Sequence, residues 1–323
     1  MLGSLFLGAF VVGSAKLVVV GATIRRGAHD FACNDGRVVV ENERGVPMIL
    51  VAGATGNVGG ELVRALADAG ETVRAMSRGP TPSWLPEGVE GVVGDLDRPE
   101  SLADALDGVG GVFLLPGYRD MPGLLAEVRR AGVGRVVLLS GGSAEDGDMD
   151  NAISRYMILS EEAVRESGVP WTILRPSGFM SNALRWAPQL RSGDVVRAPF
   201  AGVRVAAIDP HDIAAVAAEA LISAGHEGHA YRLSGPEALL PADQVRVLAF
   251  VLGRDLRFEG QPDAEARAEM EGVMPTEYVD AFFSFYVEGT LDESKVYPTV
   301  EEITDAKPRT FEQWAVAHAG AFL

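Results

Sequence analysis

The sequence predicts an α/β protein built on a doubly wound parallel sheet, with a smaller lobe formed by the carboxy-terminal half of the chain. Two observations predict this fold class. Short apolar runs alternate with segments of helical spacing from Met48 to Pro176, and such alternation implies right-handed crossovers between parallel strands. The first apolar run, Met48–Ala52, is continuous, which is typical of a strand buried on both faces.

The predicted elements follow one another along the chain. Strands are predicted at 48–52, 72–76, 89–93, 110–115, 135–140, 171–174 and 203–208. Helices are predicted at 61–69, 99–106, 122–131, 152–166, 213–223, 241–252, 275–287 and 312–319. Gly70 and Gly253 each follow a helix at the position that favours a left-handed residue. Asp209 or Asp212, and Thr310, precede helices as capping residues.

A glycine-rich turn lies between the first strand and the first helix, where residues 53–60 read Gly-Ala-Thr-Gly-Asn-Val-Gly-Gly. Gly53 permits a tight turn, Gly56 lets backbone amides approach a pyrophosphate, and Gly59 lets the helix pack closely on the sheet. The helix begins there with unpaired N–H groups and the positive end of its dipole. The pattern predicts a Rossmann-type dinucleotide site. Further residues of the turn that we expect to contact the nucleotide are Thr55, Asn57 and Val58.

The end of the second strand predicts which nucleotide is preferred. Proteins that use NAD(H) usually place an acidic residue there, which binds the ribose 2′-hydroxyl. This chain has Ser77 and Arg78 instead. Because a guanidinium matches the geometry of phosphate oxygens, we expect NADP(H) to be preferred, with Arg78 and Ser77 at the 2′-phosphate. NAD(H) stays open as an alternative.

In sheets of this kind, ligands bind beyond the carboxyl ends of the strands. The residues expected to meet in this crevice are Asp95, Leu96, Leu115, Pro116, Ser140, Ser143 and Pro176. Asp95 and Leu96 are placed to frame the adenine. Leu115, Pro116 and Ser140 are placed nearer the nicotinamide.

The chain resembles the NmrA-like group of atypical short-chain dehydrogenases/reductases. The segments that carry the resemblance are Gly53–Gly59, Arg78, Gly94–Leu96, Ser160–Pro176, Ile208–Ala214 and Tyr231–Pro236. The resemblance extends over nearly all of residues 48–323 and implies a Rossmann fold, an NAD(P) cofactor and an oxidoreductase function. It does not select a substrate, because the group includes quinone reductases, plant phenolic ether reductases and non-catalytic nucleotide sensors.

The chain departs from this resemblance at two positions. The wider superfamily uses a tyrosine that moves the substrate proton, and a lysine four residues later that lowers the tyrosine pKa and binds the nicotinamide ribose. These positions fall on Ile153 and Met157, and there is no lysine between Lys16 and Lys295. The candidate proton donors that remain are Tyr156, Ser140 and Ser143.

Hydride transfer depends mainly on how the nicotinamide is oriented over its acceptor, and a conjugated acceptor can take its proton from water. We therefore expect an NADPH-dependent reductase of a small conjugated acceptor, such as a quinone or an enone. The alternative is a non-catalytic NADP(H)-binding redox sensor that acts through a protein partner, an alternative motivated by Met157. A sugar-nucleotide epimerase fits less well, since it depends on the missing tyrosine and lysine.

The second half supplies candidate walls for an acceptor pocket and no metal site. The apolar side chains expected near the crevice, with ordinary core packing as the alternative, are Phe179, Met180, Trp186 and Phe200. Tyr278, Phe282 and Phe285 share one face of a predicted helix, which suits a lid, a dimer surface or core packing. His226 and His229 lack a third ligand, so we expect no metal.

The composition narrows the range of partners. The chain has 45 acidic and 28 basic side chains and a net charge of -17, which disfavours binding to nucleic acid and to anionic membranes. Cys33 is the only cysteine, so an intramolecular disulfide is excluded. We expect a cytoplasmic monomer or homodimer that acts on a small molecule.

Residues 1–47 differ from the rest of the chain. The segment 2–24 is apolar except for Lys16, which follows an apolar run instead of preceding it as in a signal peptide, and which is costly within a membrane span. Three interpretations remain: a non-native start before Met48, a disordered or surface-packed extension, and a membrane or export segment. Beyond it we expect a nucleotide-binding domain over 48–180, and the remaining sheet strands with the substrate lobe over 181–323.

Overall fold

The computed structural model describes residues 33–34, 37–38, 48–80 and 82–323. The interpretations of residues 1–47 fall almost entirely outside the described residues. Within that segment, β1 (Cys33–Asn34) and β2 (Arg37–Val38) pair antiparallel.

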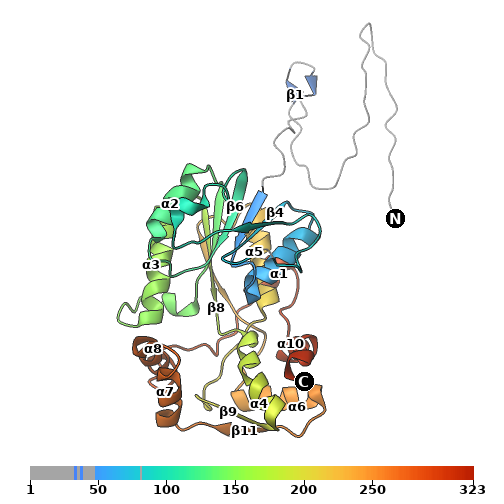
Figure 1. Ribbon diagram of the computed structural model, residues 1–323, viewed down its shortest axis with the longest axis vertical. Helices are drawn as coiled ribbons and strands as arrows, with labels where there is room; N and C mark the ends of the chain where they lie inside the picture. Colours follow the sequence, from blue (N-terminus) through green and yellow to red (C-terminus); the bar gives the residue numbers. More distant parts are fainter. Residues whose placement is uncertain (1–32, 35–36, 39–47, 81) are drawn as a thin grey trace, which may run out of the picture. The chain divides into compact units, whose positions relative to one another are not determined.

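Seven parallel strands form the central sheet, in the order β10–β8–β7–β6–β3–β4–β5 (Figure 1). Their bounds are β3 (Met48–Ala52), β4 (Val73–Ser77), β5 (Glu90–Val93), β6 (Val109–Leu114), β7 (Arg135–Leu139), β8 (Trp171–Pro176) and β10 (His229–Leu233). The order runs outward from β3 in both directions, so the predicted doubly wound α/β fold is confirmed. Strand β10 comes from the second half of the chain and pairs with β8.

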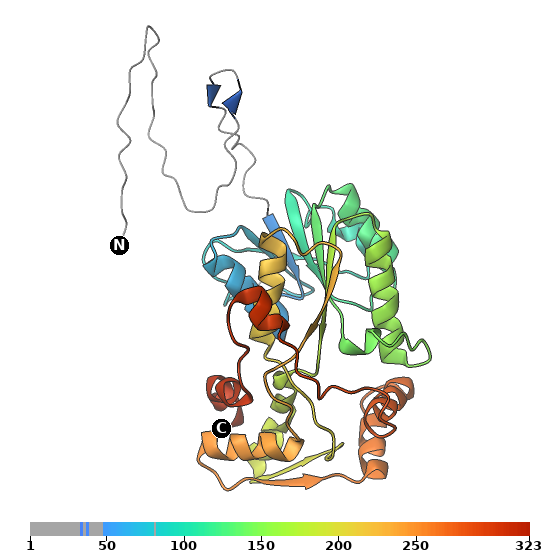
Figure 2. The ribbon, with the colours of Figure 1, turned by 180° about the vertical axis from the view of Figure 1, so that it is seen from behind.

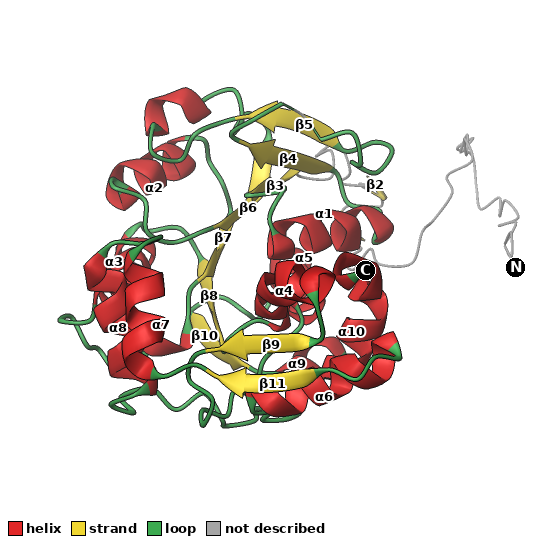
Figure 3. Ribbon diagram, turned by 60° about the horizontal axis from the view of Figure 1, so that its bottom comes forward, coloured by secondary structure: helices red, strands yellow, loops and turns green. Residues whose placement is uncertain are grey.

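Helices cover both faces of the sheet (Figures 1 and 3). Helices α1 (Asn57–Asp68) and α5 (Pro210–Ile222) pack on one face, and α2 (Met121–Arg130) and α3 (Ala152–Glu166) pack on the other. Successive side chains of a strand point to opposite faces. Val51 therefore belongs to the core under α1 and α5, whereas Leu50 belongs to the core under α2 and α3.

The smaller lobe lies beyond the carboxyl edge of the sheet (Figure 2). Its elements are the 3₁₀ segment η3 (Met180–Trp186), α4 (Ala187–Ser192), β9 (Val195–Ala198), α6 (Pro241–Leu252), β11 (Arg257–Gly260), α7 (Asp263–Glu271), α8 (Thr276–Tyr286), α10 (Phe311–His318) and the 3₁₀ segment η4 (Ala319–Phe322). Helix α9 (Thr299–Thr304) returns to the sheet domain, where Val300 packs in the core under α1 and α5. Strands β9 and β11 pair in parallel. One core of this lobe surrounds the fully buried Trp314, and a separate cluster joins α7 to α8 through Ala266, Val279 and Phe283.

Two predicted elements are wrong. Residues 99–106 form only a short 3₁₀ segment, η1 (Pro99–Leu102). Residues 203–208 form no strand, because their backbone N–H groups bond to three different segments and no continuous ladder results. Val205 donates to the carbonyl of Leu239, Ala206 to that of Glu293, and Ile208 to that of Gly178.

The predicted helix ends agree with the structure. Gly70 and Gly253 have φ angles of 83° and 63°, which a side chain with a Cβ rarely adopts. Asp209 rather than Asp212 caps α5, since its carboxylate accepts a hydrogen bond from the backbone N–H of His211. Thr310 caps α10.

Candidate active site

The glycine-rich turn has the geometry that its sequence implies. Gly53 has a φ of 65°, and a Cβ at this position would lie 2.6 Å from Cδ1 of Leu115. A Cβ on Gly59 would lie 2.2 Å from the carbonyl oxygen of Gly53, so only glycine allows α1 to pack against the turn. Helix α1 begins at Asn57, and its N-cap Gly56 carries no side chain that could cap it. The first N–H groups of α1 therefore suit a bound phosphate.

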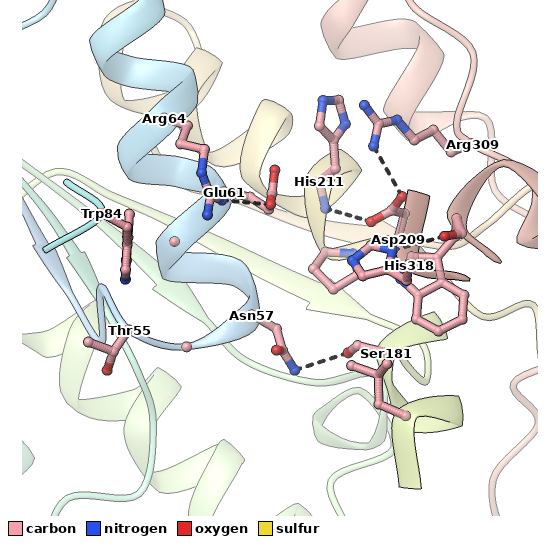
Figure 4. Close-up of a pocket in the computed structure, with 15 residues that line it drawn as sticks. Thr55, Asn57, Glu61, Arg64, Trp84, Ser181, Asp209, His211, Arg309 and His318 are labelled. Atoms are coloured by element: carbon pink, nitrogen blue, oxygen red, sulfur yellow. Dashed lines mark hydrogen bonds and ion pairs between the residues drawn. The ribbon is translucent and has the colours of Figure 1, made fainter. Parts of the chain in front are cut away.

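A pocket of about 260 Å³ lies beside this turn, between the sheet domain and the smaller lobe. This glycine-turn pocket is lined by Thr55, Gly56, Asn57, Gly60, Glu61, Arg64, Trp84, Ser181, Leu184, Asp209, Pro210, His211, Arg309, Trp314 and His318. Figure 4 shows Nδ2 of Asn57 bonded to Oγ of Ser181, at 3.1 Å. It also shows Arg309 directed at Asp209, with 3.5 Å between Nη1 and Oδ2. These contacts join the turn to η3 and the start of α5 to the segment that precedes α10.

Arg78 lies exposed at the end of β4 and forms no ion pair with another described residue. The hydroxyl of the neighbouring Ser77 donates to a backbone carbonyl two residues later, at 3.0 Å. Burial raises the pKa of Tyr118; the charge of Arg78 opposes this rise, and Asp97 and Asp95 add to it. Arg78 and Asp95 therefore each lie within electrostatic range of Tyr118, beyond β4 and β6.

A larger, open cleft of about 530 Å³ lies beyond the carboxyl ends of β6, β7 and β8. This tyrosine cleft is lined by Leu115, Pro116, Gly117, Tyr118, Leu139, Ser140, Tyr156, Met157, Phe179 and Tyr278. None of these side chains carries a charge at neutral pH, and four of them are aromatic. The cleft therefore suits a flat, uncharged molecule.

Tyr156 stands in this cleft on α3 and faces Tyr278 of α8, with ring centroids 6.5 Å apart at an angle of 66°. Burial, with a smaller contribution from Tyr278, raises the pKa of Tyr156 above its usual value. The phenol is therefore neutral at physiological pH and is able to donate a proton. The hydroxyl of Ser160 donates to the carbonyl of Tyr156 at 2.7 Å and accepts from the N–H of Gly117 at 2.9 Å, which holds α3 against the β6 loop.

Ser140 directly follows β7 and belongs to a buried charged network. Its hydroxyl donates to Oε1 of Glu161 at 2.7 Å, and Glu161 is only 1% exposed. Arg175 binds both oxygens of this carboxylate, at 2.9 and 2.7 Å, and Arg165 binds Oε2 at 2.8 Å. Burial opposes ionisation, but the hydrogen bonds from Arg175 and Ser140, together with the arginine charges, hold the pKa of Glu161 below its usual value. Met157 has its Sδ 3.9 Å from Oγ of Ser140.

The structure brings only part of the expected set together. The predicted residues that line the tyrosine cleft are Leu115, Pro116, Ser140, Tyr156 and Phe179. The side chains of Val58 and Leu96 lie in the two cores, so only their backbone groups are available to a ligand. Ser143 is buried in the 3₁₀ segment η2 (Gly142–Ala144) and does not line the cleft.

Other expected side chains lie elsewhere. Pro176 is buried within β8. Met180 and Trp186 pack in the core of the smaller lobe. Phe200 packs on Phe283, with their ring centroids 5.4 Å apart. Sequence reasoning missed Tyr118 and Glu161. The sequence does carry a signal for Glu161, which is an acidic residue in the third turn of α3. Ser140, just after β7, and Arg175, near the end of β8, lie on the sheet face that this helix covers.

The described residues contain no group of three or more His, Cys, Asp or Glu side chains that could hold a metal ion. In the same part of the chain, no helix is long and apolar enough to span a membrane.

Known proteins share both the sequence pattern and the fold. A family model described as NAD(P)H-binding matches residues 53–224. A (4-alkanoyl-5-oxo-2,5-dihydrofuran-3-yl)methyl phosphate reductase of Streptomyces griseus is 44% identical, over 85% of this chain and 99% of that protein. An NAD(P)H azoreductase of Xenophilus azovorans is 36% identical, over 85% and 99%.

Among solved structures, the NADPH complex of an Escherichia coli quinone oxidoreductase superposes with a TM-score of 0.69 at 22% identity. The match covers 84% of this chain and 99% of that one. At this identity the likeness shows a common fold.

Proposed function

The chain belongs to the NAD(P)H-binding family, and from this premise we propose that it is an NmrA-like, atypical short-chain reductase that transfers hydride from NADPH to a small conjugated acceptor of the enone or quinone type. As a member of this family it is an NAD(P)H-dependent oxidoreductase. The proposal adds the preferred nucleotide, the class of acceptor and the residue that donates the proton.

The observation that carries the proposal is the tyrosine cleft. Its wall contains four aromatic rings and no charged side chain, so it accommodates a flat conjugated ring without desolvating a charge. Its hydroxyl groups come from Ser140 and three tyrosines. Gly53 lies so close to Leu115 of the cleft that a Cβ on Gly53 would be 2.6 Å from Cδ1 of Leu115. The glycine turn and the tyrosine cleft are therefore adjacent.

The two reductase relatives support a conjugated acceptor. The name of the Streptomyces griseus protein describes a dihydrofuranone ring that carries an alkanoyl group, and the Xenophilus azovorans protein is named for an azo substrate. In the first name, the ring double bond is conjugated with the ring carbonyl and the alkanoyl group.

The preference for NADPH rests on Arg78. This guanidinium is exposed just after β4, where NAD(H)-binding proteins usually have the acidic residue that binds the ribose. It has no carboxylate partner among the described residues. An arginine in this setting binds a 2′-phosphate with paired N–H donors.

When bound, NADPH supplies the hydride for the β-carbon of the acceptor. The chain contributes the orientation of the acceptor in the tyrosine cleft and a proton. We assign the proton to the phenol of Tyr156, which donates it to the carbonyl oxygen that gains the electron pair of the reduced double bond. The phenolate then recovers a proton from water. Since burial raises the pKa of Tyr156, the phenol is in the donor state before the reaction.

The proposal is tested with the full chain by following NADPH oxidation at 340 nm with a panel of enones, quinones and azo compounds, and with simple ketones as the matched controls. NADPH binding is verified by fluorescence in the same preparation. We expect turnover with conjugated acceptors and little with ketones. Turnover of ketones at equal rates, or binding without any turnover, would contradict the proposal.

One observation favours a second candidate function. Met157, which cannot move a proton, lines the cleft at the position where the resemblance implies a lysine. A redox sensor would bind NADP⁺ and NADPH and change its association with a partner or a second copy by different amounts. Equal association in both redox states would exclude this candidate.

The proposal further includes a cytoplasmic monomer or homodimer that acts on a small molecule. The net charge of -17 supports the absence of nucleic acid and anionic membrane among its partners.

A further inference from the structure

The hydroxyl of Ser140 lies between a buried carboxylate and the tyrosine cleft. On one side it lies 2.7 Å from Oε1 of Glu161, and on the other it borders the tyrosine cleft. A serine hydroxyl has one proton and two lone pairs, whereas an ionised carboxylate only accepts. The proton of Ser140 is therefore directed at Glu161, and the serine oxygen has lone pairs left for a donor in the cleft.

Glu161 is held so that it does not turn away from Ser140. Nε of Arg175 shares Oε1 with the serine at 2.9 Å, while Nη2 of Arg175 and Nη2 of Arg165 bind Oε2 at 2.7 and 2.8 Å. Such paired, charge-assisted bonds are strong and add geometric specificity. The carboxylate is almost fully buried, and the two arginines keep it ionised.

The sheet itself builds this arrangement. Leu139 of β7 pairs with Leu174 of β8, so Ser140 and Arg175, each one residue later, lie side by side at the carboxyl edge. Both side chains point to the face covered by α3, where Glu161 lies between them. The network depends on strand register, and register is strongly specified in a sheet that is buried on both faces.

The direction of this hydrogen bond limits what Ser140 can contact. Enones and quinones offer carbonyl oxygens, which need a donor, and the proton of Ser140 is already engaged. The nicotinamide half of the cofactor does offer donors, namely the carboxamide N–H₂ and the ribose hydroxyls. The acceptor molecule therefore needs a hydrogen-bond donor from the cleft, whereas the nicotinamide half of the cofactor needs a hydrogen-bond acceptor. Ser140 can supply only the second.

We propose that Ser140 accepts a hydrogen bond from the nicotinamide half of NADPH, and that Glu161 is a positioning residue that holds the serine in this role. The proposal rests on the proposed function for the identity of the nucleotide. It removes Ser140 from the candidate proton donors and leaves Tyr156 for that step.

The test compares two ligands of the full chain in the absence of any acceptor. NADPH contains the nicotinamide half, whereas adenosine 2′,5′-bisphosphate keeps the adenosine and its 2′-phosphate and lacks the nicotinamide and its ribose. Ser140→Ala should weaken NADPH binding about fivefold to tenfold and leave the bisphosphate unchanged. Ser192→Ala, at an exposed serine that bonds to the carbonyl of Pro188, is the matched control and should change neither.

Glu161→Gln tests the positioning role. The variant should weaken NADPH in the same selective manner, and the double variant Ser140→Ala/Glu161→Gln should bind NADPH no worse than Ser140→Ala, because both changes act through one hydroxyl. Glu162→Gln, at an exposed neighbouring glutamate, is the matched control.

Three outcomes would overturn the proposal: unchanged NADPH affinity in Ser140→Ala, equal weakening of both ligands, or additive losses in the double variant. If Glu161→Gln does not fold, the two-ligand comparison for Ser140→Ala decides by itself. No acceptor is present, so a failed acceptor panel contradicts the proposed function while this binding result stands separately.

Discussion

Asn57 and Ser181 are 124 positions apart in the chain, yet Nδ2 of Asn57 donates to Oγ of Ser181 across 3.1 Å. The bond joins the first residue of α1 to η3. Because Phe179, the residue before η3, lines the tyrosine cleft, the nucleotide turn and the cleft wall are mechanically connected through Ser181.

This bond gives the first prediction. Asn57→Ala and Ser181→Ala should each lower the free energy of unfolding by about 1 kcal/mol, and the double variant should lose no more than the larger single loss. Urea unfolding of the four proteins measures the coupling. Fully additive losses would show that the two side chains act independently.

Arg78→Ala should weaken NADPH binding about tenfold to a hundredfold, the range expected for a lost hydrogen-bonded charge pair, and leave NADH binding nearly unchanged. Fluorescence titration with both nucleotides measures the two dissociation constants. Arg98→Ala, which removes another exposed arginine, is the control. An equal loss for both nucleotides would remove Arg78 from the 2′-phosphate site.

Tyr156→Phe should lower kcat for conjugated acceptors about a hundredfold to a thousandfold, within the range of a lost general acid, with NADPH affinity unchanged. Since the raised pKa of Tyr156 keeps the phenol protonated, the rate should stay level through neutral pH and fall only in the alkaline range. Tyr231→Phe, at a tyrosine bonded to His226, is the matched control. An unaffected rate in Tyr156→Phe would mean that water supplies the proton.

Gly59→Ala and Gly60→Ala form a matched pair in α1. A Cβ on Gly59 would lie 2.2 Å from a backbone oxygen, whereas the nearest atom to a Cβ on Gly60 is at 3.4 Å. We expect Gly59→Ala to cost about 3 kcal/mol of stability, and Gly60→Ala to be neutral or to gain up to about 1 kcal/mol. The urea midpoints of the two variants and the parent chain measure these changes in stability. An unchanged midpoint for Gly59→Ala would show that α1 is able to shift.

Glu161 should make stability depend on pH on the acid side. Its folded-state pKa is lowered, so its ionisation stabilises the fold above the usual glutamate range, near pH 4, and this contribution is lost as the pH falls through the folded-state value. Thermal unfolding between pH 3 and 7 should show a shallower acid limb for Glu161→Gln than for Glu162→Gln. Identical acid limbs would show that Glu161 contributes no such linkage.

The features that the sequence determined by itself are local ones. The apolar run Met48–Ala52, the glycine spacing and the helical periodicity up to Glu166 identify their elements, because each depends on neighbours within a few residues. The position of Arg78 at the end of β4 follows from the same local pattern. The predicted elements at 99–106 and 203–208 were wrong, and the second has strand-like composition but bonds to three separate segments. The periodicity also left out β10, the edge strand that pairs with β8.

The tertiary structure alone decided the contents of the cleft. Tyr278 reaches Tyr156 from a helix more than one hundred residues away, and Glu161 meets Ser140 and Arg175 only because strand register places their side chains on the face of α3. Burial also decided that Val58 and Leu96 point into the cores and that the hydroxyl of Ser140 is engaged by a carboxylate. Local periodicity states which residues form a strand or helix, but side-chain pairing across the sheet depends on register and packing, which no short window of sequence contains.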